Sequence, residues 1–319
     1  MNNNPTSGGN SEEIDEGVWD INKIEEKVNK PSQWGSVGAK LFKAFPVTHS
    51  KLPSGCYAMT QDNHDERIVF VGKDIKNDKI IRFNGDLTDN LLNEIDDFWK
   101  KENVFKECGF LHKRGYLLYG SAGTGKSSIV WQVSQALIDK GGVVFTCDNP
   151  RFFFQGLKDF RRVEPKRPIV CVFEDIDAII KKYGDMEILS ILDGDNQVNG
   201  VINIATTNYP EVLDKRINNR ARRFDRVYKI EFPDDAVREA FLKEKLTKKH
   251  NVKEWMKKTE DLSFAALAET VVSVVCLGND LDDTIKTLRD LANKNVSSSD
   301  SNSGVGFGAT KNDEPEDGE

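Results

Sequence analysis

The middle of the chain alternates short apolar runs with stretches of helical periodicity. Apolar runs that predict buried strands occur at 116–119, 143–147, 168–173, 201–207 and 226–230. Stretches with apolar residues at helical spacing lie between them, at 128–138, 150–163 and 185–192. Strands that alternate with helices predict an α/β fold, in which a parallel sheet carries helices on both faces. Ligands of such a sheet bind outside the carboxyl ends of its strands.

The flanking segments have different patterns. Short strands at 56–59, 68–71 and 80–83, separated by polar turns, predict a small antiparallel sheet. Apolar clusters within 19–28 and 37–45 predict helices that pack against the main body, and a partner-docking helix is the alternative. Beyond residue 234 only helical patterns occur, at 236–246, 264–275 and 281–291, which predicts a small all-helical domain.

These patterns divide the chain into five predicted regions. They are a disordered segment at 1–17, a mixed N-terminal region at 18–83, the α/β domain at 84–233, a helical lid at 234–292 and a disordered acidic tail at 293–319.

Charge and cysteine usage narrow the class of protein. The net charge of −7 gives no global basic field for nucleic acid, although a local basic channel is compatible with it. The five cysteines are scattered without a C-x-x-C spacing, which favours reduced thiols in a cytoplasmic protein. We find no apolar run of membrane-spanning length and no signal-peptide pattern, so we expect no membrane association.

A phosphate-binding loop connects the strand at 116–119 to the helix that follows. The residues Gly120, Ser121, Ala122, Gly123, Thr124, Gly125, Lys126 and Ser127 fit G-x-x-x-x-G-K-[ST], and Ser128 continues into the helix. Glycines let backbone N–H groups face an anion, and the helix N-terminus adds its positive dipole end. The motif predicts that Lys126 reaches the β- and γ-phosphates and that the Ser127 hydroxyl binds Mg²⁺.

Two acids and an amide follow the next strands. Glu174 and Asp175 end the strand at 168–173, in the arrangement of a Walker B motif, and a capped helix is the alternative interpretation. Asn208 ends the strand at 201–207, where it could bind the γ-phosphate or the attacking water, or be an ordinary turn residue. Phosphoryl transfer needs such groups because a metal must be held and a water oriented.

Basic residues crowd the segment that leads into the last strand and include the first residue of that strand. They are Arg216, Arg220, Arg222, Arg223 and Arg226. Some of them could reach the γ-phosphate on a neighbouring subunit as arginine fingers. A basic surface or nucleic-acid patch is the alternative.

Together these motifs make residues 80 to 290 resemble a classical AAA ATPase of the AAA+ superfamily. The run 114–120 resembles the approach to Walker A, 173–179 resembles Walker B, 205–208 resembles sensor 1, and 213–226 resembles the second region of homology. The subfamily that it resembles most is that of the mitochondrial Rieske-protein translocase, whose membrane anchor we do not find in this chain.

The resemblance implies an ATPase that uses ATP and Mg²⁺ and assembles into a ring, usually a hexamer. It implies that Ser127 and Glu174 hold Mg²⁺, that Asp175 polarises the attacking water and that Asn208 is sensor 1. Arg220 and Arg223 would be the fingers offered in trans.

Three pairs of neighbouring residues depart from the family pattern. The acids occur as Glu then Asp rather than Asp then Glu, which makes the assignment of the base less secure. Ser121-Ala122 replaces Pro-Pro, and Ala221-Arg222 replaces Pro-Gly between the fingers.

Candidate contacts with a client follow two of the strands. Phe152, Phe153 and Phe154 lie where the family places an aromatic pore loop, and core packing is the alternative. Lys181-Lys182-Tyr183 is a second candidate. We expect the ring to remodel or translocate a protein client. The alternatives are a DNA-acting helicase or clamp loader, and a nucleotide-gated scaffold.

Overall fold

The computed structural model describes residues 33–38, 41–45, 48–62, 67–74, 87–194, 197–213 and 223–293 of the 319. The chain divides into two compact units, Met1–Pro53 and Ser54–Glu319.

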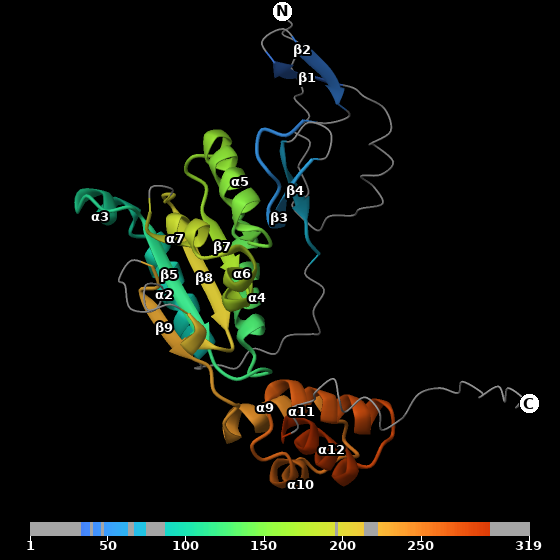
Figure 1. Ribbon diagram of the computed structural model, residues 1–319. Helices are drawn as coiled ribbons and strands as arrows, with labels where there is room; N and C mark the ends of the chain where they lie inside the picture. Colours follow the sequence, from blue (N-terminus) through green and yellow to red (C-terminus); the bar gives the residue numbers. More distant parts are fainter. Residues whose placement is uncertain are drawn as a thin grey trace, which may run out of the picture. The chain divides into compact units, whose positions relative to one another are not determined.

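In the first unit, β1 (Gln33–Gly38) and β2 (Leu41–Phe45) form an antiparallel hairpin (Figure 1), in which Gln33 pairs with Phe45. The helix predicted within 37–45 is therefore wrong. Glycine at 35 and 38 disfavours a helix, while the neighbouring aromatic and β-branched residues favour extended strands. The helix predicted at 19–28 lies outside the described residues.

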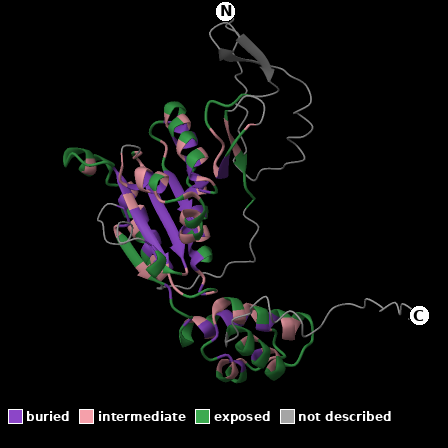
Figure 2. Ribbon diagram, viewed as in Figure 1, coloured by how far each residue is buried: buried purple, intermediate pink, exposed green. Residues whose placement is uncertain are grey.

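The second unit contains a seven-stranded sheet with the order β4-β3-β6-β7-β8-β5-β9. Its strands are β3 (Gly55–Gln61), β4 (Ile68–Gly72), β5 (Lys113–Tyr119), β6 (Val143–Thr146), β7 (Ile169–Phe173), β8 (Val201–Thr207) and β9 (Arg226–Lys229). Every pair of neighbours is parallel except β3 and β4. The predicted parallel sheet is confirmed, and its central strands are buried (Figure 2).

Helices cover both faces of this sheet. They are α2 (Leu87–Trp99), α4 (Lys126–Ile138), α5 (Pro150–Val163), α6 (Ile176–Tyr183) and α7 (Met186–Leu192), whereas the short α3 (Glu102–Glu107) buries none of its residues. The apolar sides of α2 and α4 share one core with alternate strand residues such as Val170 and Val172. The intervening residues point the other way, so that Phe173 meets Phe153 of α5 with ring centroids 5.4 Å apart.

The strands β3 and β4 do not form the separate small sheet that the sequence predicted. They pair with each other in antiparallel register, but β3 also pairs in parallel with β6, from Gly55 opposite Val143 to Ala58 opposite Thr146. The boundary predicted between residues 83 and 84 therefore cuts a continuous sheet. The strand predicted at 80–83 lies outside the described part of the chain.

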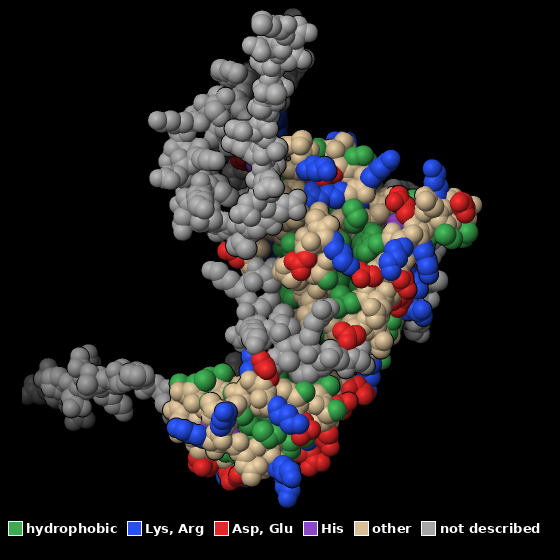
Figure 3. All heavy atoms as spheres, turned by 180° about the vertical axis from the view of Figure 1, so that it is seen from behind, with side chains coloured by type: hydrophobic (Ala, Val, Ile, Leu, Met, Phe, Trp, Pro, Cys, Tyr) green, Lys and Arg blue, Asp and Glu red, His purple; other side chains and the backbone are tan. Residues whose placement is uncertain are grey.

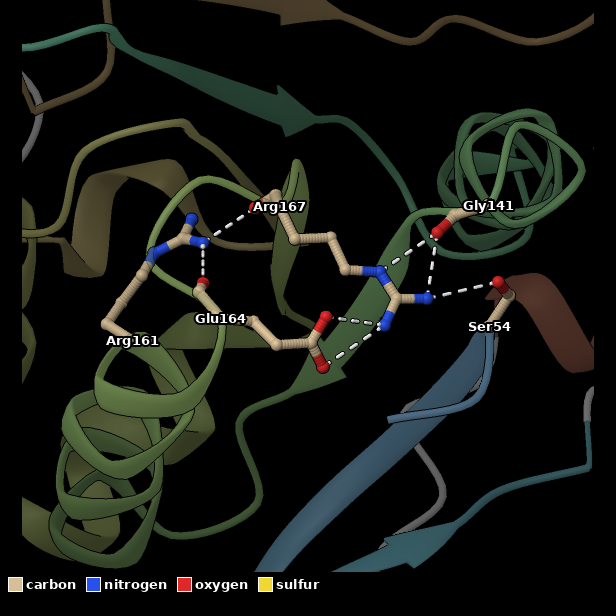
Figure 4. A network of polar contacts seen from close by, with 5 residues as sticks. All are labelled: Ser54, Gly141, Arg161, Glu164 and Arg167. Carbon is tan, nitrogen blue, oxygen red and sulfur yellow. Dashed lines mark hydrogen bonds and ion pairs between the residues drawn. The ribbon is translucent and has the colours of Figure 1, made fainter. Parts of the chain in front are cut away.

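Arg167 ties the added strand β3 to the rest of the sheet (Figure 4). Its guanidinium donates to Ser54 Oγ at 3.1 Å, to Gly141 O at 2.9 and 2.8 Å, and to both carboxylate oxygens of Glu164 at 3.2 and 3.0 Å. Ser54, Gly141 and Arg167 lie just before β3, β6 and β7, so one side chain holds the amino ends of three strands together.

Arg161 extends this network to a fourth strand. It donates to the carbonyl oxygens of Glu164 and Arg167 at 3.2 and 2.6 Å, and to that of Gly200, which precedes β8, at 2.8 Å. Burial lowers the pKa of Arg161, an effect that the nearby Cys171 and Glu164 oppose.

The C-terminal helical region comprises α9 (Asp235–Lys245), α10 (Val252–Lys258), α11 (Phe264–Val271), the π-helical turn Val272–Cys276 and α12 (Leu281–Asn293). Its helices share a separate core that includes Leu242, Trp255 and Leu267. The predicted all-helical character of this region is confirmed. Among the described residues, no helix combines the length and apolarity needed to cross a membrane.

Candidate functional site: a phosphate loop beside two acids

The predicted phosphate loop runs from the end of β5 to the start of α4. Gly120 and Gly123 have φ of 152° and 76°, a range that L side chains rarely adopt. Space is also short, because a Cβ on Gly120 would lie 2.1 Å from Ile230 O, and one on Gly123 would lie 2.9 Å from Ser263 Oγ. Ser127 and Ser128 are exposed in the first turn of α4. The loop is thus shaped by its glycines and open at the helix N-terminus, as anion binding requires.

Lys126 is folded back over this loop. The side chain is largely buried, and its Nζ donates to the carbonyl oxygens of Gly120 and Ser121 at 2.8 Å each. Burial lowers its pKa, and the carboxylates of Asp175 and Asp177 oppose that shift. Because an ammonium has three N–H donors, one more can serve an anion in the loop.

The acid pair directly follows β7. Asp175 has φ of 46° and ψ of 55°, a left-handed conformation that is costly for a non-glycine residue. Its backbone N–H donates to Thr206 Oγ1 of β8 at 3.0 Å, which holds the turn. Asp175 is therefore fixed at the carboxyl edge of the sheet by its neighbour strand, and α6 begins immediately after it.

Glu174 carries an oxygen without a partner. Its Oε1 is buried and accepts no hydrogen bond within the described part of the chain. Buried polar atoms are normally satisfied, so an orphaned carboxylate oxygen at a strand end suits a cation or its bound water. Together with the exposed Ser127 hydroxyl, this donor set fits a hydrated Mg²⁺, which prefers oxygen ligands and retains several waters.

A second hydrogen-bonded link joins the ends of β7 and β8. Thr207 Oγ1 donates to Asp177 Oδ1 at 2.6 Å and accepts from the backbone N–H of Tyr209 at 3.0 Å. Asn208, the predicted sensor, lies between these residues and is half-buried. Sequence reasoning missed Thr206 and Thr207, although two threonines directly before Asn208 were the available signal.

The predicted arginine fingers are described only in part. Arg220 lies outside the described residues, as do Arg216 and Arg222. Arg223 is 6% exposed and its Nε donates to Asp193 Oδ2 at 3.2 Å, just after α7 of the same chain. Arg226 pairs with Glu94 of α2 at 3.1 Å. In this conformation Arg223 is held within its own chain, and a role in trans would require release from Asp193.

The aromatic candidates divide between core and surface. Phe153 is buried, whereas Phe152 and Phe154 are half-buried, and Lys158 Nζ lies 4.0 Å from the centroid of the Phe154 ring. The three phenylalanines thus do not share one environment, because successive residues of a helix point in different directions. Tyr183 ends α6 and is half-buried, with Lys182 Nζ 4.8 Å from its ring centroid.

The C-terminal helical region contacts the phosphate loop. Ser263 caps α11 by accepting from the backbone N–H of Ala266 at 3.2 Å, and the N–H of Ala265 donates to Gly123 O at 3.1 Å. The first turn of α11 therefore lies against the loop, so a change in the conformation of the loop would alter its contacts with the helical region.

A strand, a glycine loop, a helix and an acid pair that meet at the carboxyl edge of a parallel sheet define a P-loop nucleoside triphosphatase fold. The narrower assignment comes from comparison with known families. Residues 116–232 match the model of the family described as "ATPase family associated with various cellular activities (AAA)". Residues 116–232 are therefore similar to an AAA ATPase domain.

Relatives share this domain at about 30% identity. The "ATP-dependent zinc metalloprotease FtsH" of Aster yellows witches'-broom phytoplasma is 30% identical over 63% of this chain and 33% of its own length. The "Mitochondrial inner membrane i-AAA protease supercomplex subunit YME1" of Saccharomyces cerevisiae is 31% identical over 56% of this chain and 27% of its own. The "Proteasome-activating nucleotidase" of Methanococcus maripaludis is 29% identical over 54% and 46%. The matches thus span between a quarter and a half of these relatives.

Proposed function

We propose that this protein binds ATP with Mg²⁺ at the loop Gly120–Ser128 and hydrolyses it. The observation that carries the proposal is geometric: the glycine loop with Lys126 folded over it follows β5, and the acid pair follows β7, so both leave the carboxyl edge of one parallel sheet. A cation for phosphates and carboxylates for metal and water then lie at one edge of the sheet, where phosphoryl transfer needs them. The AAA match covers the same residues.

Each residue has a separate part in this proposal. Backbone N–H groups of the loop and Lys126 bind the phosphates, while Ser127 and Glu174 hold the metal. Mg²⁺, when bound, neutralises charge on the phosphate oxygens. Asp175, fixed by Thr206, orients and polarises the attacking water. Asn208 directly follows β8, the neighbour of β7, and contacts either the γ-phosphate or that water.

We further infer that the active assembly is a ring, with six subunits as the expected number. Arg220 and Arg223 would approach the nucleotide of the neighbouring subunit. This proposal is supported by the position of the two arginines in the sequence, after β8 and the predicted sensor Asn208. Closeness to the Rieske-protein translocase subfamily and a cytoplasmic location stay predictions from the sequence.

A protein client is favoured over nucleic acid. Relatives named as proteases and as a proteasome-activating nucleotidase share the domain. On the face shown in Figure 3, the basic and acidic side chains of the described residues are intermixed rather than segregated. Such a surface supplies little of the positive field by which proteins bind nucleic acid without regard to sequence.

The test is the rate of ATP hydrolysis by the purified full chain, measured alone, with an unfolded protein and with single-stranded DNA. We expect Mg²⁺-dependent turnover that unfolded protein stimulates. Arg220→Ala should lose turnover and keep nucleotide binding, and Arg151→Ala, an exposed arginine at the start of α5, is the control. Stimulation by DNA alone would favour the DNA-acting alternative, and binding without any turnover would favour the scaffold.

A further inference from the structure

A cavity of about 300 Å³ lies beside the acid pair. It opens at the carboxyl ends of β6 and β7, and its wall includes Thr146, Glu174, Trp131 of α4, Lys73 and Asp148. Lys73 comes from the segment after β4, so the added hairpin contributes directly to a space next to the proposed metal ligand.

Two buried oxygens in this wall have no hydrogen-bond partner among the described residues. They are Thr146 Oγ1 and Glu174 Oε1. Thr146 is only 7% exposed, so its hydroxyl is well shielded. Because unsatisfied acceptors in a buried place are unfavourable, a donor that enters the cavity would bind there.

Lys73 is the cation in the cavity wall, and a neighbouring acid holds it. Its backbone N–H donates to Cys56 O at 2.8 Å, which fixes where the side chain starts. Its Nζ donates to the two carboxylate oxygens of Asp148 at 2.9 and 2.7 Å. The two side chains are 38% and 55% exposed, so solvent weakens the pair and the flexible lysine can exchange partners.

Three charged side chains of this wall all affect the pKa of one thiol, that of Cys56. Burial raises the pKa of the Cys56 thiol to about 11, Lys73 lowers it, and the carboxylates of Asp148 and Glu174 raise it. A single thiol on β3 is therefore in the field of all three groups. Asp74, the remaining acid in the wall, is exposed and directly follows Lys73.

We propose that Asp148 is a positioning residue, which holds Lys73 away from Glu174 and keeps the free oxygen of Glu174 available to the water shell of Mg²⁺. The inference rests on the proposed function, because it concerns the metal side of the same site. Without Asp148, Lys73 pairs with Glu174 and competes with the metal. The added β3–β4 hairpin thereby influences how much Mg²⁺ the nucleotide site needs.

The experiment measures binding of a fluorescent ATP analogue to the full chain over a titration of Mg²⁺, so no turnover is required. For Asp148→Asn, the Mg²⁺ concentration at half-maximal binding should rise about two- to five-fold, the range expected for a partly exposed ion pair. Adding Lys73→Met to this variant should return the midpoint to that of the wild type, because the competitor is gone. Lys73→Met alone should leave it unchanged.

A matched control removes a carboxylate elsewhere. Asp96→Asn breaks the exposed pair of Asp96 with Lys140, at 2.5 Å, and changes the net charge equally. It should leave the midpoint unchanged.

Two outcomes would overturn this inference alone: an unchanged midpoint in Asp148→Asn, or a raised midpoint that Lys73→Met fails to reverse. Failure of the wild type to bind the analogue at any Mg²⁺ concentration would instead overturn the proposed function, and the inference with it.

Discussion

Replacing Arg167 by methionine should destabilise the second unit strongly, because this side chain joins the amino ends of three strands. The substitution keeps much of the apolar stem and removes hydrogen bonds to Ser54, Gly141 and Glu164. The Glu164 side chain is 6% exposed, so its carboxylate would be left buried without the arginine. Breaking a buried ion pair by removing one partner costs about 3–5 kcal/mol.

Urea unfolding followed by tryptophan fluorescence measures this cost. With a slope on the order of 3 kcal/mol/M, the midpoint for Arg167→Met should fall by roughly 1–1.7 M. Arg162→Met is the matched control, because Arg162 pairs with Asp159 three residues earlier but its side chain is 75% exposed. That variant should lose about 0.5 kcal/mol or less. Adding Glu164→Gln to Arg167→Met should recover part of the loss, since the buried charge is then absent.

Equal midpoints for Arg167→Met and Arg162→Met would mean that removing Arg167 costs no more than removing an exposed arginine. They would show that the network in Figure 4 does not hold β3 to the sheet.

Three further predictions concern the site. Thr206→Val removes the acceptor of the Asp175 N–H, so kcat should fall about ten-fold, which corresponds to about 1.4 kcal/mol, while ATP affinity stays unchanged. An equal loss of ATP affinity would contradict the positioning role of Thr206. Gly123→Ala places a side chain on a left-handed backbone and against Ser263 and Ala265, so ATP affinity measured by titration should fall at least about ten-fold. Unchanged ATP affinity would show that the loop tolerates this side chain. Thiol titration at pH 8 should find only Cys108 and Cys276 reactive until unfolding, because the other three are buried; rapid reaction of more than two would contradict that burial.

Much of the fold could be predicted because its signals are local. The strand before the phosphate loop, the glycines and the acid pair are contiguous in sequence, and their apolar and polar pattern fixes which face is buried. The start of α5 is equally local, because Asn149 Oδ1 accepts from the Arg151 N–H at 3.0 Å and Pro150 lies between them. Short helices such as α3, α6 and α10 span only two turns or so, too few for a clear periodic signal.

The remaining features depend on partners that are distant in sequence. The alternation within β3 shows a strand, but nothing in it indicates pairing with β6 some ninety residues later. Thr206 and Asp175 are 31 residues apart, and the bond between them exists only once β7 and β8 are neighbours. The pair between Arg223 and Asp193 is equally non-local, so sequence alone could suggest an exposed finger where the structure has a buried guanidinium.

Glu174 and Asp175 have different parts in the proposed reaction, one on the metal and one on the attacking water, and a paired measurement on two variants separates them. ATP binding and ATP turnover are measured for Asp175→Asn and for Glu174→Gln over a range of Mg²⁺ concentrations. We predict that Asp175→Asn binds ATP with the Mg²⁺ dependence of the wild type and turns over at least about a hundred-fold more slowly, as loss of a group that acts on the attacking water implies. Glu174→Gln should need a higher Mg²⁺ concentration than the wild type for half-maximal binding of ATP, because it lacks a metal ligand. Wild-type turnover by Asp175→Asn would contradict the account.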